Sequence, residues 1–486
     1  MKFIKTFVTI FILLITIVGH SQQSIVFEKT YRTETTDTVI MALTGAQTSD
    51  GGYLLGGYAA YGMYLSQMMF FKIDSVGNYQ WKKTYGSLPC SSNMIHDMGP
   101  VGDGTFICCG EGTFSTEGAP SDLKPTNSMI MRVDENANII WHKEFDAGWH
   151  ECLYELALSD TGYLCVGYKQ DMTKDPGHFL WIAGDIVGSS SKLSTLDMGQ
   201  GWQSATSTTL LPNNQFALGG SADSKSVILT LDSYGDTIQS IVLGTGYPET
   251  IGIQDVDFIN ELLFCGGYKS DIQEYGVNAY FSSCDIDFQN IEFTFFEHEN
   301  EMQDSYSQKI VVENDDSFLI IGIMRTPNRG NDLWLKKHDS NKQLTWARYI
   351  GGDGYESLRD IIKTNDGGYL IIGESNSFDD YNSMYIVKID SLGQGNYTNP
   401  IEILVKANNE LVVFPNPAND KVYVQLPNNN RNYTIEIYDL NGRKTFYQSS
   451  LSDQYCIDVK NWKNGMYLLK VNYNNEFYQS KLIINH

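Results

Sequence analysis

A short phrase recurs seven times along this chain and constrains its fold more than any other feature. Its clearest copies are Asp-Gly-Gly-Tyr-Leu-Leu-Gly-Gly at 50–57 and Asp-Gly-Gly-Tyr-Leu-Ile-Ile-Gly at 366–373. Looser copies are centred on the anchors Phe106, Tyr163, Phe216, Leu262 and Phe318, each with a glycine four residues later. Neighbouring anchors are 46 to 57 residues apart. A self-similar period of this length indicates a stacked or radial repeat architecture.

Each repeat unit reads as four short strands. In the last unit, residues 360–363, 369–373 and 384–390 are rich in β-branched and aromatic residues and are separated by turn sequences. The fourth strand is clearest in the first unit, at 79–86. Such runs, punctuated by Asp-Gly and Ser-x-Gly turns, are typical of antiparallel hairpins. Seven four-stranded units predict an all-β fold, a seven-bladed β-propeller.

The two ends of the array test this interpretation. The seventh unit stops after its third strand, near 393–395, while residues 25–31 at the other end match the fourth strand at 80–85, with Phe27 in the place of Trp81. The N-terminal strand is therefore predicted to complete the last blade and close the ring. Closure hides the two edge strands that an open array would expose.

The N-terminus and the charge of the chain limit where it acts and what it binds. Residues 1–21 combine a basic start, an apolar run at 7–18 and a small-x-small site, which is the pattern of a secretory signal peptide. No later segment reaches 18 apolar residues, so no transmembrane segment is expected in the mature chain. With 34 Lys+Arg against 58 Asp+Glu, the net charge of -24 disfavours nucleic acid as a partner.

Motifs for catalysis or metal binding do not emerge from the spacing of residues. There is no His-Glu-x-x-His, Gly-x-Ser-x-Gly or Walker A pattern, and the histidines are scattered. His150 beside Trp149 is the most site-like, but a surface or satisfied histidine is the preferred interpretation. The eight cysteines fit mostly free, buried thiols, because several occupy apolar strand positions. No catalytic residue, metal ligand or cofactor is assigned.

A ligand site is expected on one face of the disc. The two turns inside each unit are short and regular, whereas the connections on the opposite face, such as 111–128 and 297–306, vary widely. Binding usually resides in variable loops on a rigid scaffold, so a site is predicted on that face or at the mouth of the channel.

Four aromatic residues on that face form a candidate ligand-binding set. They share a preceding glycine and lie 14 or 15 residues before their anchors: Trp149, Trp202, Tyr247 and Tyr355. These rings have the chemistry to stack on sugar rings. The alternative is that they pack between blades, which their equivalence across repeats favours.

A different kind of segment follows residue 410. It contains Phe-Pro-Asn-Pro-Ala at 414–418, Asp-Leu-Asn-Gly-Arg at 439–443 and Asn-Gly-Met-Tyr at 464–467. Strands broken by Pro-Asn and Asn-Gly turns predict a small β-sandwich. The segment resembles the type A C-terminal sorting domain of type IX secretion system cargo from Bacteroidetes. The residues that carry the resemblance are Pro415, Asn416, Pro417, Asn441, Gly442 and Gly465.

The resemblance implies passage across the inner membrane by the signal peptide and across the outer membrane by the secretion machinery, to the extracellular space or the cell surface. The repeats also resemble propeller-like repeats of such cargo. The expected domains are a signal peptide (1–21), a propeller (24–397), a linker (398–410) and a sorting domain (411–486).

The expected function is a secreted or surface propeller that binds an extracellular glycan, another surface polymer or a protein. Two alternatives stay open: a secreted hydrolase or lyase with a site built from loops, and a structural adhesion protein.

Overall fold

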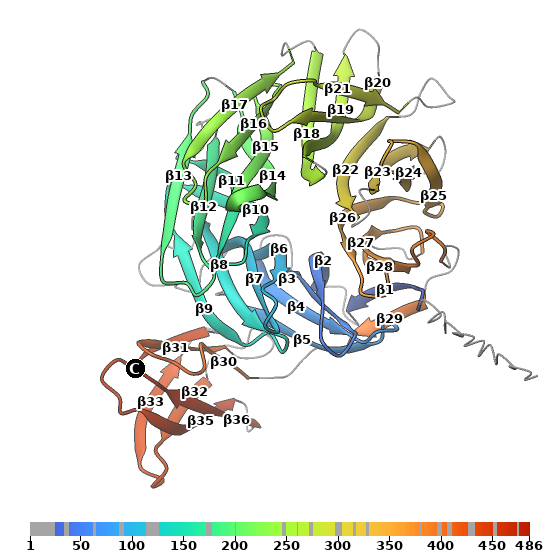
Figure 1. Cartoon of the computed structure of the whole chain (residues 1–486). Coiled ribbons are helices and arrows are strands. Elements are labelled where there is room, and N and C mark those ends of the chain that lie inside the picture. The colour runs from blue at the N-terminus through green and yellow to red at the C-terminus, as the bar shows by residue number, and fades with distance from the viewer. Residues whose placement is uncertain are drawn as a thin grey trace, which may run out of the picture.

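The fold is built from β-strands arranged around a ring, with a small second domain beside it (Figure 1). The computed structural model describes residues 25–486 except for 34–37, 62–64, 87–91, 113–125, 172–176, 200, 245–248, 260, 272–275, 297–303, 314–316, 327–329, 379–381, 396–400, 406–410, 426–432, 451–453 and 474–475. The predicted signal peptide lies outside the described residues. In the described part of the chain, no helix has the length and hydropathy needed to span a bilayer.

Six blades are formed by four consecutive strands each. Blade 1 consists of β2 (Thr38–Gln47), β3 (Tyr53–Tyr61), β4 (Leu65–Ile73) and β5 (Tyr79–Tyr85). Blade 2 consists of β6 (Met94–Pro100), β7 (Thr105–Gly112), β8 (Asn127–Asp134) and β9 (Ile139–Phe145). Blade 3 consists of β10 (His150–Leu158), β11 (Gly162–Gln170), β12 (His178–Asp185) and β13 (Ser191–Leu196).

The next three blades repeat this order. Blade 4 consists of β14 (Gln203–Leu211), β15 (Gln215–Ala222), β16 (Lys225–Leu231) and β17 (Thr237–Leu243), with a 3-10 turn at Pro212–Asn214. Blade 5 consists of β18 (Glu249–Ile259), β19 (Leu262–Asp271), β20 (Gly276–Asp285) and β21 (Glu292–Phe295). Blade 6 consists of β22 (Ser305–Val312), β23 (Phe318–Thr326), β24 (Gly330–His338) and β25 (Leu344–Ile350).

The seventh blade confirms the predicted ring closure. It contains β26 (Glu356–Lys363), β27 (Tyr369–Ser375) and β28 (Ser383–Ile389), and its fourth strand is β1 (Phe27–Thr33) from the N-terminus. Strand β1 pairs antiparallel with β28, from Phe27 opposite Lys388 to Tyr31 opposite Met384. The Tyr31 hydroxyl donates a hydrogen bond to Gly77 O over 2.6 Å, which ties this seam to blade 1.

A fifth strand extends the seventh blade. Strand β29 (Ile401–Val405) runs parallel to β1 on its outer side, with Lys29 opposite Ile401. Part of the segment that the sequence suggests as a linker is therefore a strand of the propeller.

The first strand of each blade lines the centre of the ring. Strands β2, β6, β10, β14, β18, β22 and β26 contact their neighbours around the ring. The apolar residues of the middle strands fill the space between blades, and the described cysteines that lie there are free and buried: Cys108, Cys109, Cys152, Cys165, Cys265 and Cys284. Burial of this continuous apolar layer is the main stabilising term for such a fold.

The C-terminal domain is made of two small sheets with a shared core. One sheet contains β30 (Val412–Phe414), β31 (Lys421–Gln425) and β34 (Gln454–Asp458). The other contains β32 (Tyr433–Tyr438), β33 (Lys444–Ser450), β35 (Gly465–Tyr473) and β36 (Glu476–Ile484). The two peptide bonds that precede Pro415 and Pro417 are cis. Phe414 packs edge-on against Tyr85 of blade 1, with ring centroids 4.8 Å apart.

Candidate functional site in the central channel

Every innermost strand carries a β-bulge at the same place. The repeat glycine on the neighbouring strand leaves room for the backbone just before this bulge. A Cβ added to that glycine would lie 1.9 to 2.2 Å from a carbonyl oxygen of the innermost strand, just before the bulge. Only glycine admits a backbone this close. The seven glycines are Gly57, Gly110, Gly167, Gly220, Gly267, Gly322 and Gly373.

In blade 5, the residue equivalent to the anchors of the other blades stands one position later than the repeat phrase suggests. Gly267 is opposite Ile253 before the bulge, as Gly57 is opposite Ala42 in blade 1. Leu263 therefore takes the position that Tyr53 holds, one residue after the Leu262 that the repeat phrase suggests. Two adjacent glycines in this copy make the phrase ambiguous in the sequence.

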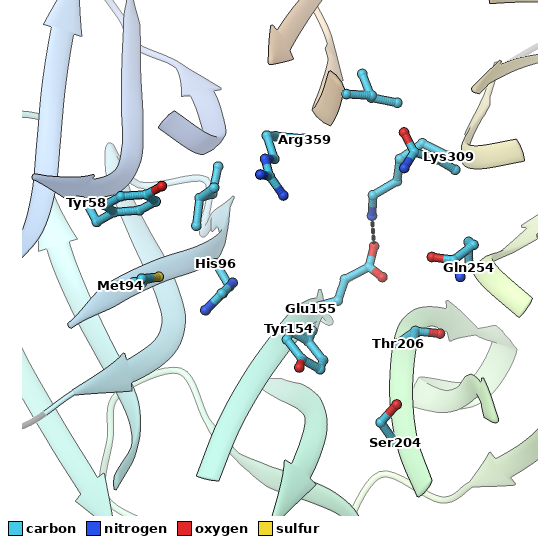
Figure 2. Close-up of a pocket in the computed structure, with 13 residues that line it drawn as sticks. Tyr58, Met94, His96, Tyr154, Glu155, Ser204, Thr206, Gln254, Lys309 and Arg359 are labelled. Carbon is cyan, nitrogen blue, oxygen red and sulfur yellow. Dashed lines mark hydrogen bonds and ion pairs between the residues drawn. The ribbon is translucent and has the colours of Figure 1, made fainter. Parts of the chain in front are cut away.

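The bulge aims one side chain from each blade into the mouth of the channel, because an extra residue re-orients the strand locally. The seven bulged residues are Leu43, His96, Tyr154, Thr206, Gln254, Gln308 and Arg359. All seven line one cavity of about 500 Å³. Figure 2 shows His96, Tyr154, Thr206, Gln254 and Arg359 arriving at this cavity from different blades.

The residue after each bulge forms a ring of polar side chains deeper in the channel. The seven members are Thr44, Asp97, Glu155, Ser207, Asp255, Lys309 and Asp360. Lys309 Nζ donates a hydrogen bond to Glu155 Oε1 and lies 3.5 Å from Asp255 Oδ1. A second cavity of about 320 Å³ lies on the other side of this ring and shares Glu155 and Lys309 with the first.

Hydrogen bonds join the rest of the polar ring. Ser207 Oγ donates to Asp255 Oδ1 over 2.7 Å. Thr44 Oγ1 lies 3.1 Å from Asp97 Oδ1 and 2.9 Å from Asp360 Oδ2. Because the Thr44 hydroxyl has one hydrogen, it donates to only one of these carboxyls. The other carboxyl satisfies this contact if it is protonated and donates to Thr44 Oγ1.

Electrostatics agree with a shared proton in this ring. Burial raises the pKa of Asp97 and Glu155 and raises that of Asp360 to about 6, although the nearby Lys309 opposes these shifts. Desolvation acts to lower the pKa of Lys309, but the carboxylates Asp255 and Glu155 outweigh it, so the net shift is upward. Lys309 therefore stays charged, while burial favours the protonated forms of Asp97, Glu155 and Asp360.

Arg359 does not add a free positive charge to the cavity. Its Nε donates to Glu374 Oε1 over 2.7 Å, and its Nη2 contacts the same oxygen. With this pair and the acid-rich ring, the cavity offers a neutral to acidic surface of hydroxyl, amide and aromatic groups.

The aromatic residues predicted from the sequence lie elsewhere on the variable face. Trp149, Trp202 and Tyr355 are 42%, 48% and 41% exposed, and none is among the residues that line either channel cavity as described. Trp202 packs against Tyr168 with centroids 5.0 Å apart, which is a contact between adjacent blades. Tyr247 lies outside the described residues.

The sorting-domain residues occupy turns and edges. The Asn416 side chain accepts from Ile483 N over 2.8 Å and donates to Lys481 O over 2.6 Å, so it fastens the start of the domain to its last strand. Gly442 adopts a φ of 77° in the turn that also contains Asn441, and Gly465 opens β35 with a φ of 151°.

The repeat phrase marks the turns of each unit and does not reveal the channel residues. Relative to the anchors, Thr44, Asp97, Lys309 and Asp360 each stand nine residues upstream, in the first strand of their units. Charged residues at one equivalent strand position in several repeats are a detectable signal, since lone buried charges are otherwise avoided.

A second polar cluster lies between blades 2 and 3, next to the cavity. Glu111 on β7 accepts a hydrogen bond from Ser92 Oγ and lies 3.0 Å from His150 Nε2. His96 and Cys152 each place a ligand atom within 4.8 Å of this carboxylate. Although desolvation acts to raise the pKa of Glu111, the hydrogen bonds from His150 and Ser92, together with the nearby His96 imidazole, hold it well below its ordinary value.

Three solved structures show a distant resemblance to this chain. PorZ of Porphyromonas gingivalis, an essential surface component of the type IX secretion system, is 10% identical with a TM-score of 0.28, over 92% of this chain and 81% of that one. A fungal alcohol oxidase in complex with copper is 11% identical with a TM-score of 0.43, over 94% and 98%. Prolyl oligopeptidase B of Galerina marginata is 8% identical with a TM-score of 0.42, over 88% of this chain and 54% of that one. With TM-scores below 0.5, these likenesses carry no functional argument.

The C-terminal segment has a family match. No curated protein matches the chain. Residues 412–485 match the model of the secretion system C-terminal sorting domain, and they are the residues that form the two small sheets. The chain is thus a β-propeller protein that the type IX secretion system exports, through its C-terminal sorting domain, to the cell surface or the extracellular space.

Proposed function

We propose that the mouth of the channel binds a neutral, hydroxyl-rich ligand, such as a short stretch of an extracellular glycan. The observation that carries the proposal is the convergence of seven bulged side chains on one cavity of about 500 Å³. Cavities of this size with a few placed polar groups are the usual form of small-ligand sites.

The lining has the chemistry that sugars need. Gln254, Thr206 and Ser204 supply amide and hydroxyl groups, while the Tyr58 and Tyr154 rings supply flat apolar surface. Gln308 Oε1 is buried and has no hydrogen-bond partner among the described residues. A buried acceptor left unpaired costs free energy that a donating ligand would recover.

The charges in the channel argue against an anionic ligand. Four carboxyl groups and one lysine make up the charged members of the polar ring, and Arg359 is already paired with Glu374. An anion would meet four carboxyl groups and two cations that already have acidic partners, whereas a neutral sugar meets groups that both donate and accept.

The test compares the cavity with the exposed aromatic face. Purified mature protein is screened on a glycan array, and the affinity of each hit is measured by calorimetry for the wild type, Gln308→Leu and Trp202→Ala. We expect Gln308→Leu to weaken binding by up to about tenfold, the value of one neutral hydrogen bond, and Trp202→Ala to leave it unchanged. The reverse pattern would place the site on Trp149 and Trp202 instead, and no binding at all would refute the glycan proposal.

An enzyme is a second candidate, and one observation favours it. Glu155 lines the cavity, and burial raises its pKa well above the ordinary range, as a general acid in polysaccharide cleavage requires. The mature protein is therefore also screened for glycan degradation. If Glu155 is the acid, Glu155→Gln abolishes turnover but retains binding; if the wild type degrades nothing, the enzyme candidate is rejected. If the wild type neither binds nor degrades any glycan, the structural adhesion role is the remaining alternative.

A further inference from the structure

The polar cluster between blades 2 and 3 contains three potential metal ligands that are far apart in the sequence. His96, Glu111 and Cys152 are 15 and 41 residues apart along the chain, yet one ligand atom of each lies within 4.8 Å of the other two. They belong to β6, β7 and β10, three rigid strands of the scaffold. A site held by strands keeps its geometry better than one held by loops.

We propose that His96, Glu111 and Cys152 form a binding site for a divalent transition metal, with Zn²⁺ as the best match. Imidazole nitrogen, carboxylate oxygen and thiolate sulfur are the three ligand types that zinc takes in proteins. Three protein ligands leave a fourth position, which is the arrangement of zinc sites that hold water or a substrate. This inference does not depend on glycan binding in the channel.

The contact between His96 and Glu111 is poorly explained without a metal. His96 Nε2 lies 3.8 Å from Glu111 Oε1, which is too long for a hydrogen bond. This nitrogen is buried and has no hydrogen-bond partner among the described residues. Two ligands of a tetrahedral zinc ion lie about 3.3 Å apart, given metal–ligand bonds of about 2.0 Å, so a small movement would bring both onto one ion.

The surroundings orient the proposed ligands. The other oxygen of Glu111 lies 3.0 Å from His150 Nε2 and 3.4 Å from Thr126 Oγ1. The Nδ1 atom of His150 is in turn 2.9 Å from the Tyr168 hydroxyl. Such outer contacts hold metal ligands in position and raise affinity.

The proposed site adjoins the channel cavity through His96. His96 also lines the channel cavity, together with Met94 and Tyr154 from the same two blades (Figure 2). An ion that enters the mouth of the channel therefore meets the His96 imidazole first. When zinc binds, the Cys152 thiol proton is released to solvent as the S–Zn bond forms.

The test uses the mature protein, stripped with a chelator and dialysed under reducing conditions. Zn²⁺ is titrated in competition with a chromophoric chelator, and Co²⁺ then replaces it as a spectroscopic probe. We expect one Zn²⁺ per chain and, with Co²⁺, the near-ultraviolet charge-transfer band of a thiolate ligand. Protein that takes up no stoichiometric zinc, or a cobalt spectrum without this band, would overturn the inference.

Variants locate the ion. Cys152→Ser should remove the thiolate band and, like His96→Gln, weaken zinc binding by more than about 100-fold, because outer contacts alone account for about 10- to 100-fold. Cys265→Ser, which changes an equally buried thiol in blade 5, should change neither readout. If Cys152→Ser does not fold by near-ultraviolet circular dichroism, His96→Gln decides. Unchanged affinity in His96→Gln would contradict the proposal.

Discussion

At the scale of single residues, the repeat glycine links the turn phrase to the channel. It is needed where a carbonyl of the innermost strand enters the space of a side chain, and the bulge at that point sends one residue toward the cavity and the next into the polar ring. The same small residue therefore shapes the core of each blade and the lining of the candidate site.

Replacing one such glycine should be costly. In Gly57→Ala the new Cβ would lie 2.0 Å from Met41 O, which is backbone and cannot rotate away. We expect the free energy of unfolding in guanidinium to fall by about 3 kcal/mol, the upper end for overpacking. Gly99→Ala is the control, because the nearest atoms to its Cβ would be side-chain atoms of Leu158 and Leu156 rather than backbone, the closest being Leu158 Cδ1 at 2.8 Å. Equal losses in both variants would contradict the bulge explanation.

Asp257 should give stability a distinct pH dependence. Burial, followed by the charge of Asp255, raises its pKa to about 7, while Lys309 acts in the opposite direction. Because the folded state holds this proton more tightly than the unfolded state, the stabilisation is complete below about pH 4 and is lost as pH rises through 7.

The corresponding variant is Asp257→Asn, whose amide oxygen can still accept from Thr209 and from Phe258 N. Guanidinium unfolding at several pH values should show a shallower slope between pH 5 and 7 than in the wild type, by up to about 1.4 kcal/mol per pH unit. Asp160→Asn, at an exposed turn, should keep the wild-type slope. A slope unchanged in Asp257→Asn would refute the assignment.

At the scale of strands, the sequence predicts the features that recur in every repeat but not those that depend on which strands pair. The seven units, their four strands and the closing role of β1 follow from periodic turns and alternating residues. The pairing of β29 with β1 depends on a partner far away in the chain, which local patterns do not contain, and two adjacent glycines leave the Leu263 register ambiguous in the sequence. Local patterns do not show the channel site as a unit, since its seven bulged residues come from seven separate strands, although the charged position that recurs before the anchors is a signal of it.

The two outer strands of blade 7 should differ sharply in tolerance to proline. Thr30 of β1 is paired on both sides, with Tyr385 and with Glu402, whereas Ile403 lies in β29, which pairs only with β1. We expect Thr30→Pro to open the ring and lower the free energy of unfolding by about 3 kcal/mol or more, and Ile403→Pro to cost clearly less. Similar unfolding midpoints for the two variants would argue against closure by β1.

At the scale of the whole molecule, the propeller and the sorting domain share a small apolar contact. Phe414 is buried against Tyr85 of blade 1 and stacks on Tyr423 of its own domain, with centroids 5.4 Å apart. His142 of blade 2 also faces Tyr423, at 6.2 Å. The contact is narrow compared with the cores of the two domains.

Removing this contact should separate the domains without unfolding either. In Phe414→Ala we expect a larger radius of gyration by small-angle X-ray scattering and an unchanged melting transition of the propeller. Ile437→Ala, in the core of the sorting domain, should instead lower the transition of that domain. An unchanged radius in Phe414→Ala would show that other contacts hold the domains together.

The pairing of β1 with β28 in blade 7 can form only in a chain that extends as far as β28. Glu28 and Tyr385, which are hydrogen-bonded across these two strands, stand 357 residues apart in sequence. A copy truncated before residue 384 has no partner for its first strand and keeps an open edge, so partial and complete products differ in shape as well as in length. Since the sorting domain follows the last blade along the chain, every chain that has reached the sorting domain also contains all seven blades.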